Sequence, residues 1–171
     1  MKSKRIYTLA QIGVFVSVLA VVSQISIPMP FLVPITLQVL AVSLTAFLLG
    51  TKKSLTALLV YVALGLAGVP VFACFGGGVS TLFGYTGGFI WGFFPLAFFC
   101  AIGNGKIKIL FSSIGLTACH LIGVLWYSML AKIDILTSFL TMSLPYVFKD
   151  ALLVVISYFI AKLINKRIKK S

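Results

Sequence analysis

The chain alternates between long apolar runs and short polar or glycine-rich segments. Six runs are candidate helices, and they cover residues 8–27, 35–49, 54–69, 86–103, 107–130 and 144–164. A helix needs about 20 apolar residues to cross the hydrocarbon core of a membrane. We therefore predict an all-α integral membrane protein with six transmembrane helices, in a single membrane domain over residues 1–171.

The second run is short and follows a proline-rich segment. Pro28, Pro30 and Pro34 cannot continue a helix, so the first helix ends before them. At 1.5 Å per residue, residues 35–49 extend only about 22 Å, against a hydrocarbon core of about 30 Å. The second helix is therefore expected to begin below the membrane surface, with the proline-rich loop dipping in to meet it.

An irregular stretch over residues 69–93 contrasts with the runs around it. It interleaves aromatic residues and small hydroxyls with seven glycines: Gly76, Gly77, Gly78, Gly84, Gly87, Gly88 and Gly92. Non-helical backbone survives at membrane depth only where protein buries it or where it lines a cavity. This stretch predicts irregular outer loops that form a pocket for a flat, mostly apolar solute with a few hydrogen-bonding groups.

Composition supports the membrane assignment. Of 171 residues, 61% are hydrophobic and 9% are charged, and the mean hydropathy is +1.18. A soluble core of this size needs far less apolar surface. The net charge of +12 could suggest nucleic acid, but the cations separate apolar runs and form no patch on a folded face. No nucleic-acid partner is therefore expected.

The N-terminal segment and the cysteines have simple interpretations. The basic residues before the first run imitate a secretory signal, but no convincing small-residue cleavage site follows, so we expect a retained first helix. Cys74, Cys100 and Cys119 form no closely spaced pair and are interpreted as small packing residues.

The positive charges predict the orientation of the chain. On a six-helix arrangement, 12 of the 14 basic residues lie on one side: Lys2, Lys4, Arg5, Lys52, Lys53, Lys106, Lys108, Lys162, Lys166, Arg167, Lys169 and Lys170. The positive-inside rule makes that side cytoplasmic, with both termini. The remaining bases, Lys132 and Lys149, and the only acids, Asp134 and Asp150, then lie toward the outside.

The inventory of reactive groups argues against an enzyme. Two acids and one histidine give no paired carboxylates, no metal-binding motif and no serine with an identifiable base. The glycine run at residues 76–78 lacks the lysine and hydroxyl residue of a phosphate loop, and no nucleotide motif is present. We expect no metal and no cofactor, and without a nucleotide motif the chain cannot power transport by itself.

Polar side chains gather at the predicted outer ends of the helices. They are Thr36, Gln38, Ser80, Thr81, Tyr85, Thr86, Tyr127, Ser128, Tyr146, Lys149 and Asp150. Several segments contributing at one membrane level predict an outward-facing solute site. Thr36 and Gln38 could equally serve interfacial hydration or a helix start.

Asp150 is the strongest single candidate for binding. A carboxylate costs up to about 2.5–3.5 kcal/mol at the bilayer centre and less near a helix start. It can accept two N–H groups side by side from a urea-like or amide ligand, or it can simply pair with Lys149 or the helix dipole. Lys149 could meet a ligand carboxylate or extend to the surface. His120 is interpreted as a helix-packing residue.

Several motifs closely resemble the BioY family of biotin transporters. They are Pro34-Ile-Thr-Leu-Gln38, Tyr61-x3-Gly65-x2-Gly68-x-Pro70-Val-Phe-Ala73-x-Phe75-Gly-Gly-Gly78, Thr86-Gly-Gly-Phe89-x2-Gly92-Phe93, Gly123-x2-Trp126 and Pro145-Tyr-x-x-x-Asp150. The likeness covers nearly the whole chain in order. Each piece is weak alone, but the combination is specific.

The resemblance implies the substrate-binding S component of an energy-coupling factor (ECF) vitamin transporter in a prokaryotic plasma membrane. It implies a biotin pocket under a lid formed by the loop between helices one and two, and cytoplasmic association with a T component and two ATPase subunits. The family's aspartate, threonine and glutamine map onto Asp150, Thr36 and Gln38. Together the residues and the resemblance predict a substrate-binding set of Phe31, Thr36, Gln38, Phe75, Ser80, Tyr85, Thr86, Gly88, Lys149 and Asp150.

Two departures bear on this set. The family usually has Gly-Pro-Thr-Gly-Gly-Tyr where this chain has Gly84-Tyr85-Thr86-Gly87-Gly88-Phe89. A lysine expected one turn after the aspartate is replaced by Leu153, so Lys149 is the only lysine near Asp150. The partner of the ligand carboxylate is therefore less certain than that of its ureido group.

A docking surface is also predicted. Ala10, Gly13 and Ser17 place small residues along the first helix, which lets another helix approach closely in lipid. Packing within the bundle is the alternative, but the resemblance favours docking to the coupling subunit.

Two other classes of function stay open from the residues alone. One is an S component or facilitator for a different small vitamin. The other is a membrane scaffold subunit without a small-molecule site.

Overall fold

The computed structural model describes residues 2–29 and 33–168, which are mostly helical. Eight α-helices lie within these residues: α1 (Lys2–Ser23), α2 (Gln38–Leu49), α3 (Thr51–Leu66), α4 (Val79–Phe83), α5 (Gly87–Ala101), α6 (Lys106–Ala131), α7 (Ile135–Met142) and α8 (Leu144–Ile168). Two short strands, β1 (Ser26–Ile27) and β2 (Ile35–Thr36), pair antiparallel, and one 3₁₀ turn covers Ala73–Phe75.

Six of the helices correspond to the six apolar runs, with one shift at the proline-rich segment. The first helix ends at Ser23 and the second begins at Gln38, rather than at residues 27 and 35. The residues between them pair Ser26 with Thr36 in a small hairpin. Hydrogen bonds between the strands satisfy backbone groups that the prolines prevent a helix from satisfying.

The short helices α4 and α7 are absent from the prediction. Helix α4 lies inside the glycine-rich connection, which is otherwise irregular. Helix α7 is capped by Asp134, whose carboxylate accepts a hydrogen bond of 2.8 Å from the backbone N–H of Thr137. This bond favours the ionised form and holds the pKa of Asp134 below its usual value. An aspartate before an apolar segment is an N-cap signal that could have revealed the helix.

Two helical segments are long and apolar enough to cross a membrane by length and composition, Ser3–Ser23 and Ile107–Ala131. Helices α2 and α5 are shorter apolar helices. The prediction of six membrane spans and the predicted orientation of the chain therefore stay predictions.

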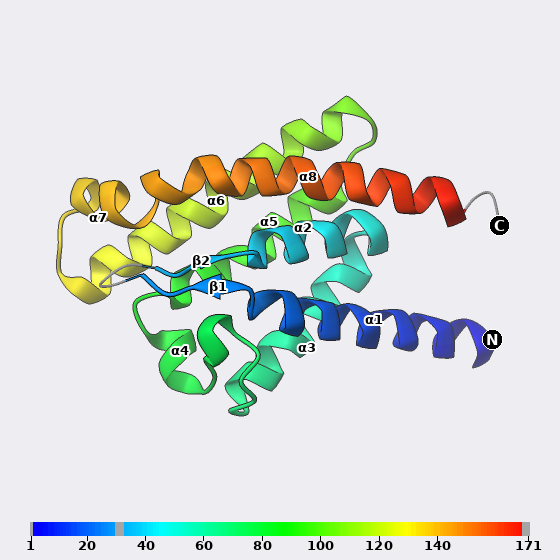
Figure 1. The fold of residues 1–171 in the computed structure, drawn as a ribbon, viewed down its shortest axis with the longest axis horizontal. Coiled ribbons are helices and arrows are strands. Elements are labelled where there is room, and N and C mark those ends of the chain that lie inside the picture. Colours follow the sequence, from blue (N-terminus) through cyan, green and yellow to red (C-terminus); the bar gives the residue numbers. More distant parts are fainter. Residues whose placement is uncertain (1, 30–32, 169–171) are drawn as a thin grey trace.

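Helix α2 forms the centre of the bundle and packs against α1, α3, α5 and α8. Its residues Ala41 and Ala46 are fully buried, and Ser43 meets Ser157 of α8 with 2.7 Å between the hydroxyl oxygens. Small side chains at these positions let the helices approach closely. In Figure 1 both termini lie at one end of the bundle, and the hairpin, α4 and α7 lie at the other end. The hairpin and the glycine-rich connection that contains α4 are therefore gathered at one end of the bundle.

Glycines in α5 set its distance from α6. A Cβ atom at Gly92 would lie 2.8 Å from the backbone of Cys119, and one at Gly88 would lie 2.4 Å from the Cβ of Trp126. Distances under 3.0 Å cannot be kept, so any larger residue must push the helices apart. The close packing of α5 on α6 therefore fixes the relative positions of cavity-lining residues that come from both helices.

Gly92→Val is expected to destabilise the fold by about 1–3 kcal/mol or more, because the clash is with backbone. Gly13→Val is the matched control, since both glycines are inside helices and no atom lies within 4 Å of a Cβ at Gly13. Thermal unfolding of the detergent-solubilised variants measures the difference. Equal melting temperatures for the two variants would contradict the close packing of α5 against α6.

Candidate functional site

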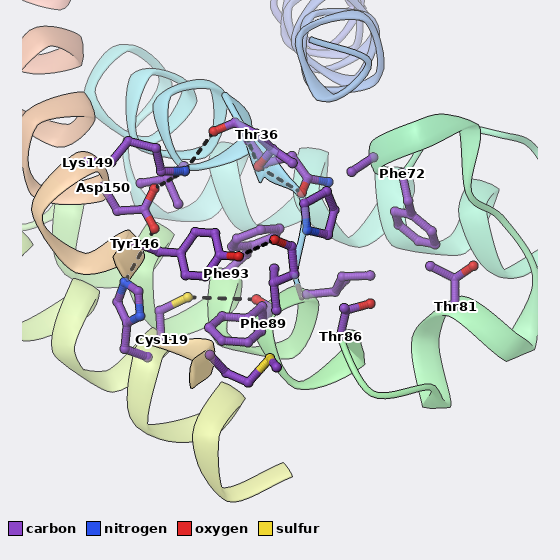
Figure 2. A pocket seen from close by; sticks show the side chains of 18 residues that line it. Thr36, Phe72, Thr81, Thr86, Phe89, Phe93, Cys119, Tyr146, Lys149 and Asp150 are labelled. Carbon is purple, nitrogen blue, oxygen red and sulfur yellow. Dashed lines mark hydrogen bonds and ion pairs between the residues drawn. The ribbon is translucent and has the colours of Figure 1, made fainter. Parts of the chain in front are cut away.

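A cavity opens beneath the hairpin, between the start of α2, the segment after α3, and helices α5, α6 and α8 (Figure 2). It contains about 690 Å³ of empty space, including its open part. Its lining consists of Val33, Pro34, Thr36, Gln38, Val39, Phe72, Ala73, Thr81, Thr86, Phe89, Ile90, Phe93, Cys119, His120, Met142, Tyr146, Lys149 and Asp150.

Three charged or titratable side chains form the polar end of the cavity. The Asp150 carboxylate is buried, with Oδ1 2.7 Å from Lys149 Nζ and Oδ2 3.4 Å from His120 Nε2. His120 is fixed from its other side, where Nδ1 lies 2.9 Å from the hydroxyl of Ser143. A buried carboxylate is tolerable only with such partners, because it gives up its hydration. The pair with Lys149 compensates much of that cost.

One oxygen of Asp150 retains capacity to accept hydrogen bonds. Within the described residues, Oδ1 is buried and accepts no hydrogen bond of acceptable geometry, although Lys149 Nζ is close to it. A carboxylate oxygen can accept two hydrogen bonds. The Asp150 carboxylate, which lines the cavity, therefore has acceptor capacity beyond its contacts with Lys149 and His120.

Helix α8 also holds the hairpin in place. Lys149 Nζ donates to the backbone carbonyl of Thr36 at 2.9 Å, and the Tyr146 hydroxyl donates to the carbonyl of Val33. Tyr146 and Lys149 are three residues apart, so they lie on neighbouring positions of one helical face. The same face of α8 thus contributes the carboxylate and anchors the segment above it.

Gln38 is held by a second buried network. Its Nε2 donates to the Tyr61 hydroxyl at 3.1 Å, and that hydroxyl donates to the Val71 carbonyl at 3.0 Å and lies 2.9 Å from Ser23 Oγ. The side-chain carbonyl of Gln38 lies 3.4 Å from Thr36 Oγ1. The network joins α1, α2, α3 and the following loop, so Gln38 has one fixed orientation at the cavity.

The opposite wall is aromatic. Phe72 is buried, with its ring edge-on to Tyr61 at a centroid distance of 5.3 Å. A Cβ at Gly65 would lie 2.1 Å from the Phe72 ring, so that position must be glycine for the ring to fit. Phe89 and Phe93, one helical turn apart on α5, line the cavity nearer the polar end, and the Phe89 ring lies edge-on to His120 at a centroid distance of 5.9 Å (Figure 2). Flat apolar rings beside and across from a carboxylate suit a flat solute with one polar edge.

The loop that carries Phe72 is tied to the end of α1. Gln24 donates from Nε2 to the Phe72 carbonyl at 3.1 Å and accepts from the Phe75 N–H at 2.9 Å. On the other side of the glycine-rich segment, Trp126 Nε1 donates to the Gly84 carbonyl at 3.0 Å. These bonds satisfy backbone groups that the irregular chain leaves unpaired.

Five of the residues predicted for the site line the cavity together: Thr36, Gln38, Thr86, Lys149 and Asp150. Four others do not line it. The side chains of Phe75, Ser80 and Tyr85 are exposed, and Gly88 packs against Trp126. The backbone of Phe75 is left-handed, with φ of 57°, and its side chain is 70% exposed. Phe31 lies outside the described residues.

Several lining residues were not singled out from the sequence. His120 is interpreted there as a packing residue, yet it contacts Asp150 and lines the cavity. Phe89 and Phe93 belong to the family motif but were not assigned to the site. Their spacing by four residues, and that of Tyr146 and Asp150, places each pair on one helical face. That spacing is the signal that could have identified them.

The described residues contain no cluster of three or more His, Cys, Asp or Glu side chains that could hold a metal ion.

Comparisons with known proteins agree on one family. The family model described as "BioY family" matches residues 1–170. A probable biotin transporter BioY of Pyrococcus horikoshii is 36% identical over 150 residues, covering 88% of this chain and 89% of that protein. The biotin transporter BioY2 of Lactococcus lactis is 34% identical over 140 residues, covering 78% of this chain and 76% of its own.

A solved structure has the same fold. The crystal structure of the S-component for biotin from an ECF-type ABC transporter matches with a TM-score of 0.88 and 22% identity, covering 97% of this chain and 94% of the other. At this identity the match speaks for the fold alone.

Proposed function

This chain belongs to the BioY family, and from that premise we propose that it captures biotin from outside the cell as the S component of an ECF-type importer. It is a transport subunit, not an enzyme. Three membrane features support the proposal: the apolar composition, the long apolar helices and the fold shared with an S-component for biotin.

The observation that carries the proposal is the buried Asp150 carboxylate opposite an aromatic wall. Biotin has a ureido ring with two N–H groups at one end and an apolar ring and chain beyond it. The Asp150 carboxylate lines the cavity and has the capacity to accept a ureido N–H, and a hydrogen bond from N–H to a carboxylate is stronger than one between neutral groups. Phe72, Phe89 and Phe93 offer contact surface to the apolar part.

Lys149 belongs to the same end of the site as Asp150. Its ammonium group is 2.7 Å from the carboxylate and also donates to the Thr36 carbonyl. A group held in that position neutralises Asp150 and cannot also reach the far end of an extended ligand. We therefore assign Lys149 to the ureido end, with Thr36 and Gln38 beside it, and leave the ligand carboxylate to residues nearer the mouth.

The orientation proposed is the one that the charges predict. The end of the bundle with both termini is cytoplasmic, and the end with the hairpin and the cavity faces outward (Figure 1). The cavity then opens toward the source of the vitamin.

Helix α1 is proposed to dock the T component, which works with two ATPase subunits. Ala10, Gly13 and Ser17 are exposed on one face of α1, whereas Val16 and Leu19 pack inward on the other. Space around Gly13 is open, and Ser17 donates its hydroxyl back to the Gly13 carbonyl, so neither residue obstructs an approaching helix. Such a surface favours close helix packing in lipid.

The purified chain in detergent is expected to bind biotin tightly and saturably without nucleotide, and Asp150→Asn should weaken binding about 10- to 100-fold while folding is retained. Calorimetric titration with biotin, thiamine and riboflavin measures both. Asp134→Asn is the matched control, because it makes the same change at the only other acid, which caps α7 instead of lining the cavity.

The outcomes separate the rival functions. Tight binding of thiamine or riboflavin instead of biotin would indicate a different vitamin. No binding of any of the three would favour a scaffold subunit. Unchanged biotin affinity in Asp150→Asn would remove Asp150 from the site.

Cysteine labelling tests the orientation. Cys74 is exposed beside the cavity end, whereas Cys100 and Cys119 are buried. A membrane-impermeant maleimide should label the wild type in intact cells. Cys74→Ser with Lys52→Cys should be labelled only after permeabilisation, since Lys52 is exposed in the first turn of α3, at the end of α2 away from the hairpin. The reverse pattern would invert the topology.

Gly13→Val should leave biotin binding unchanged and strongly reduce co-purification with the coupling subunits, because the added side chain fills the exposed face of α1. Leu9→Val is the control, as it changes an exposed apolar residue of the same helix without adding bulk. Undiminished co-purification of Gly13→Val would place docking elsewhere.

A further inference from the structure

A second hollow lies at the end of the bundle opposite the biotin cavity. It is formed where the α5–α6 connection and the start of α6 meet the last turns of α8, and it contains about 920 Å³ of space, open solvent included. Its lining consists of Phe47, Asn104, Gly105, Lys108, Tyr158, Ala161, Lys162, Asn165 and Lys166. We refer to it as the basic cleft.

Three cations from two helices converge on the basic cleft. Lys162 and Lys166 are one turn apart on the same face of α8, and Lys108 comes from the first turn of α6. The Lys108 ammonium lies 5.3 Å from the centre of the Phe47 ring, where a cation–π contact holds it toward the cleft. Like charges one turn apart repel each other. An anion placed among the three ammonium groups would relieve that repulsion.

The chain has no acidic side chain to supply that charge. Its only acids are Asp134 and Asp150. Asp134 caps α7, and Asp150 pairs with Lys149 about 18 Å before Lys162 along α8 at 1.5 Å per residue. No ion pair within the described residues involves the three lysines of the cleft. An anion from another molecule can therefore enter the cleft without competing with an acidic side chain of this chain.

The other lining groups indicate what kind of anion fits. The side-chain amides of Asn104 and Asn165 add hydrogen-bond donors to the three ammonium groups. One wall is apolar, where Tyr158 meets Phe47 edge-on at a centroid distance of 5.7 Å. Several point donors around one space suit the oxygens of a phosphate group, and the apolar wall suits the chain attached to it.

We propose that the basic cleft binds the phosphate group of an anionic phospholipid from the cytoplasmic leaflet. The cleft lies at helix ends, where headgroups lie if the orientation proposed above holds. Large apolar side chains in the same turns of α6 and α8 as the lysines, Ile107, Leu110 and Leu163, are 59%, 63% and 64% exposed and thus available to acyl chains. Basic pockets between helices on the cytoplasmic side are typical sites for anionic headgroups.

Lipid binding to the full chain tests the proposal. The probe is phosphatidylglycerol titrated against the purified protein in phosphatidylcholine nanodiscs, with bound lipid counted by native mass spectrometry. The triple variant Lys108→Gln/Lys162→Gln/Lys166→Gln should bind phosphatidylglycerol at least about tenfold more weakly than the wild type. The control Lys4→Gln/Arg5→Gln/Lys52→Gln removes three exposed cations from the same side and should stay within about twofold.

Each other result overturns the proposal in a distinct way. An equal loss in both triple variants would mean diffuse attraction and no defined site. Displacement of the lipid by millimolar inorganic phosphate would make free phosphate the ligand. Unchanged lipid binding with lost co-purification of the coupling subunits would assign the cleft to a protein partner. Biotin titration of the same samples keeps this test independent of the proposed transport function, since the biotin cavity lies at the other end.

Discussion

The ammonium group of Lys149 lies between a buried carboxylate and a backbone carbonyl, and the geometry of the cavity depends on both contacts. Its contact with Asp150 makes the buried negative charge tolerable. Its bond to the Thr36 carbonyl holds the hairpin over the opening. A molecule that donates to Asp150 shares that carboxylate with Lys149, so occupation of the site and the position of the hairpin are linked through a single side chain.

The rest of the site follows from how irregular backbone is kept satisfied. Residues 67–86 form little regular structure, yet Gln24 and Trp126 pair its carbonyls and amides from α1 and α6. This fixes the ring of Phe72 against Gly65 and Tyr61. A glycine-rich segment that would otherwise be mobile thus becomes a rigid aromatic wall, at the cost of two polar side chains committed to structure.

Much of the architecture could be predicted from the sequence because apolar runs of helical length have few alternatives. The hairpin could not, since two strands of two residues carry no periodicity to detect. Within the site, Asp150, Lys149, Gln38, Thr36 and Thr86 stand out as polar groups near helix starts and do line the cavity. Phe75 and Tyr85 stand out equally, but local backbone angles, which composition does not reveal, leave them exposed.

The role of His120 was hidden for a related reason. A single histidine in an apolar run fits packing as well as function, and only the approach of α8 brings Asp150 to within 3.4 Å of it. Contacts between segments far apart in the chain decide such cases, and residue spacing cannot supply them.

Gln24 is the residue directly after α1, and its hydrogen bond to the Phe72 carbonyl holds the loop that carries Phe72. Helix α1 and the Phe72 wall of the cavity are therefore mechanically coupled through one side chain. If the partner subunits dock on α1 as proposed, a tilt of that helix displaces the wall and changes the affinity of the cavity for its ligand. Because of thermodynamic linkage, a bound ligand must then change the affinity for the partner subunits by the same factor by which docking changes the affinity for the ligand. Under that proposal, the partner subunits distinguish loaded from empty protein without any direct contact with the ligand.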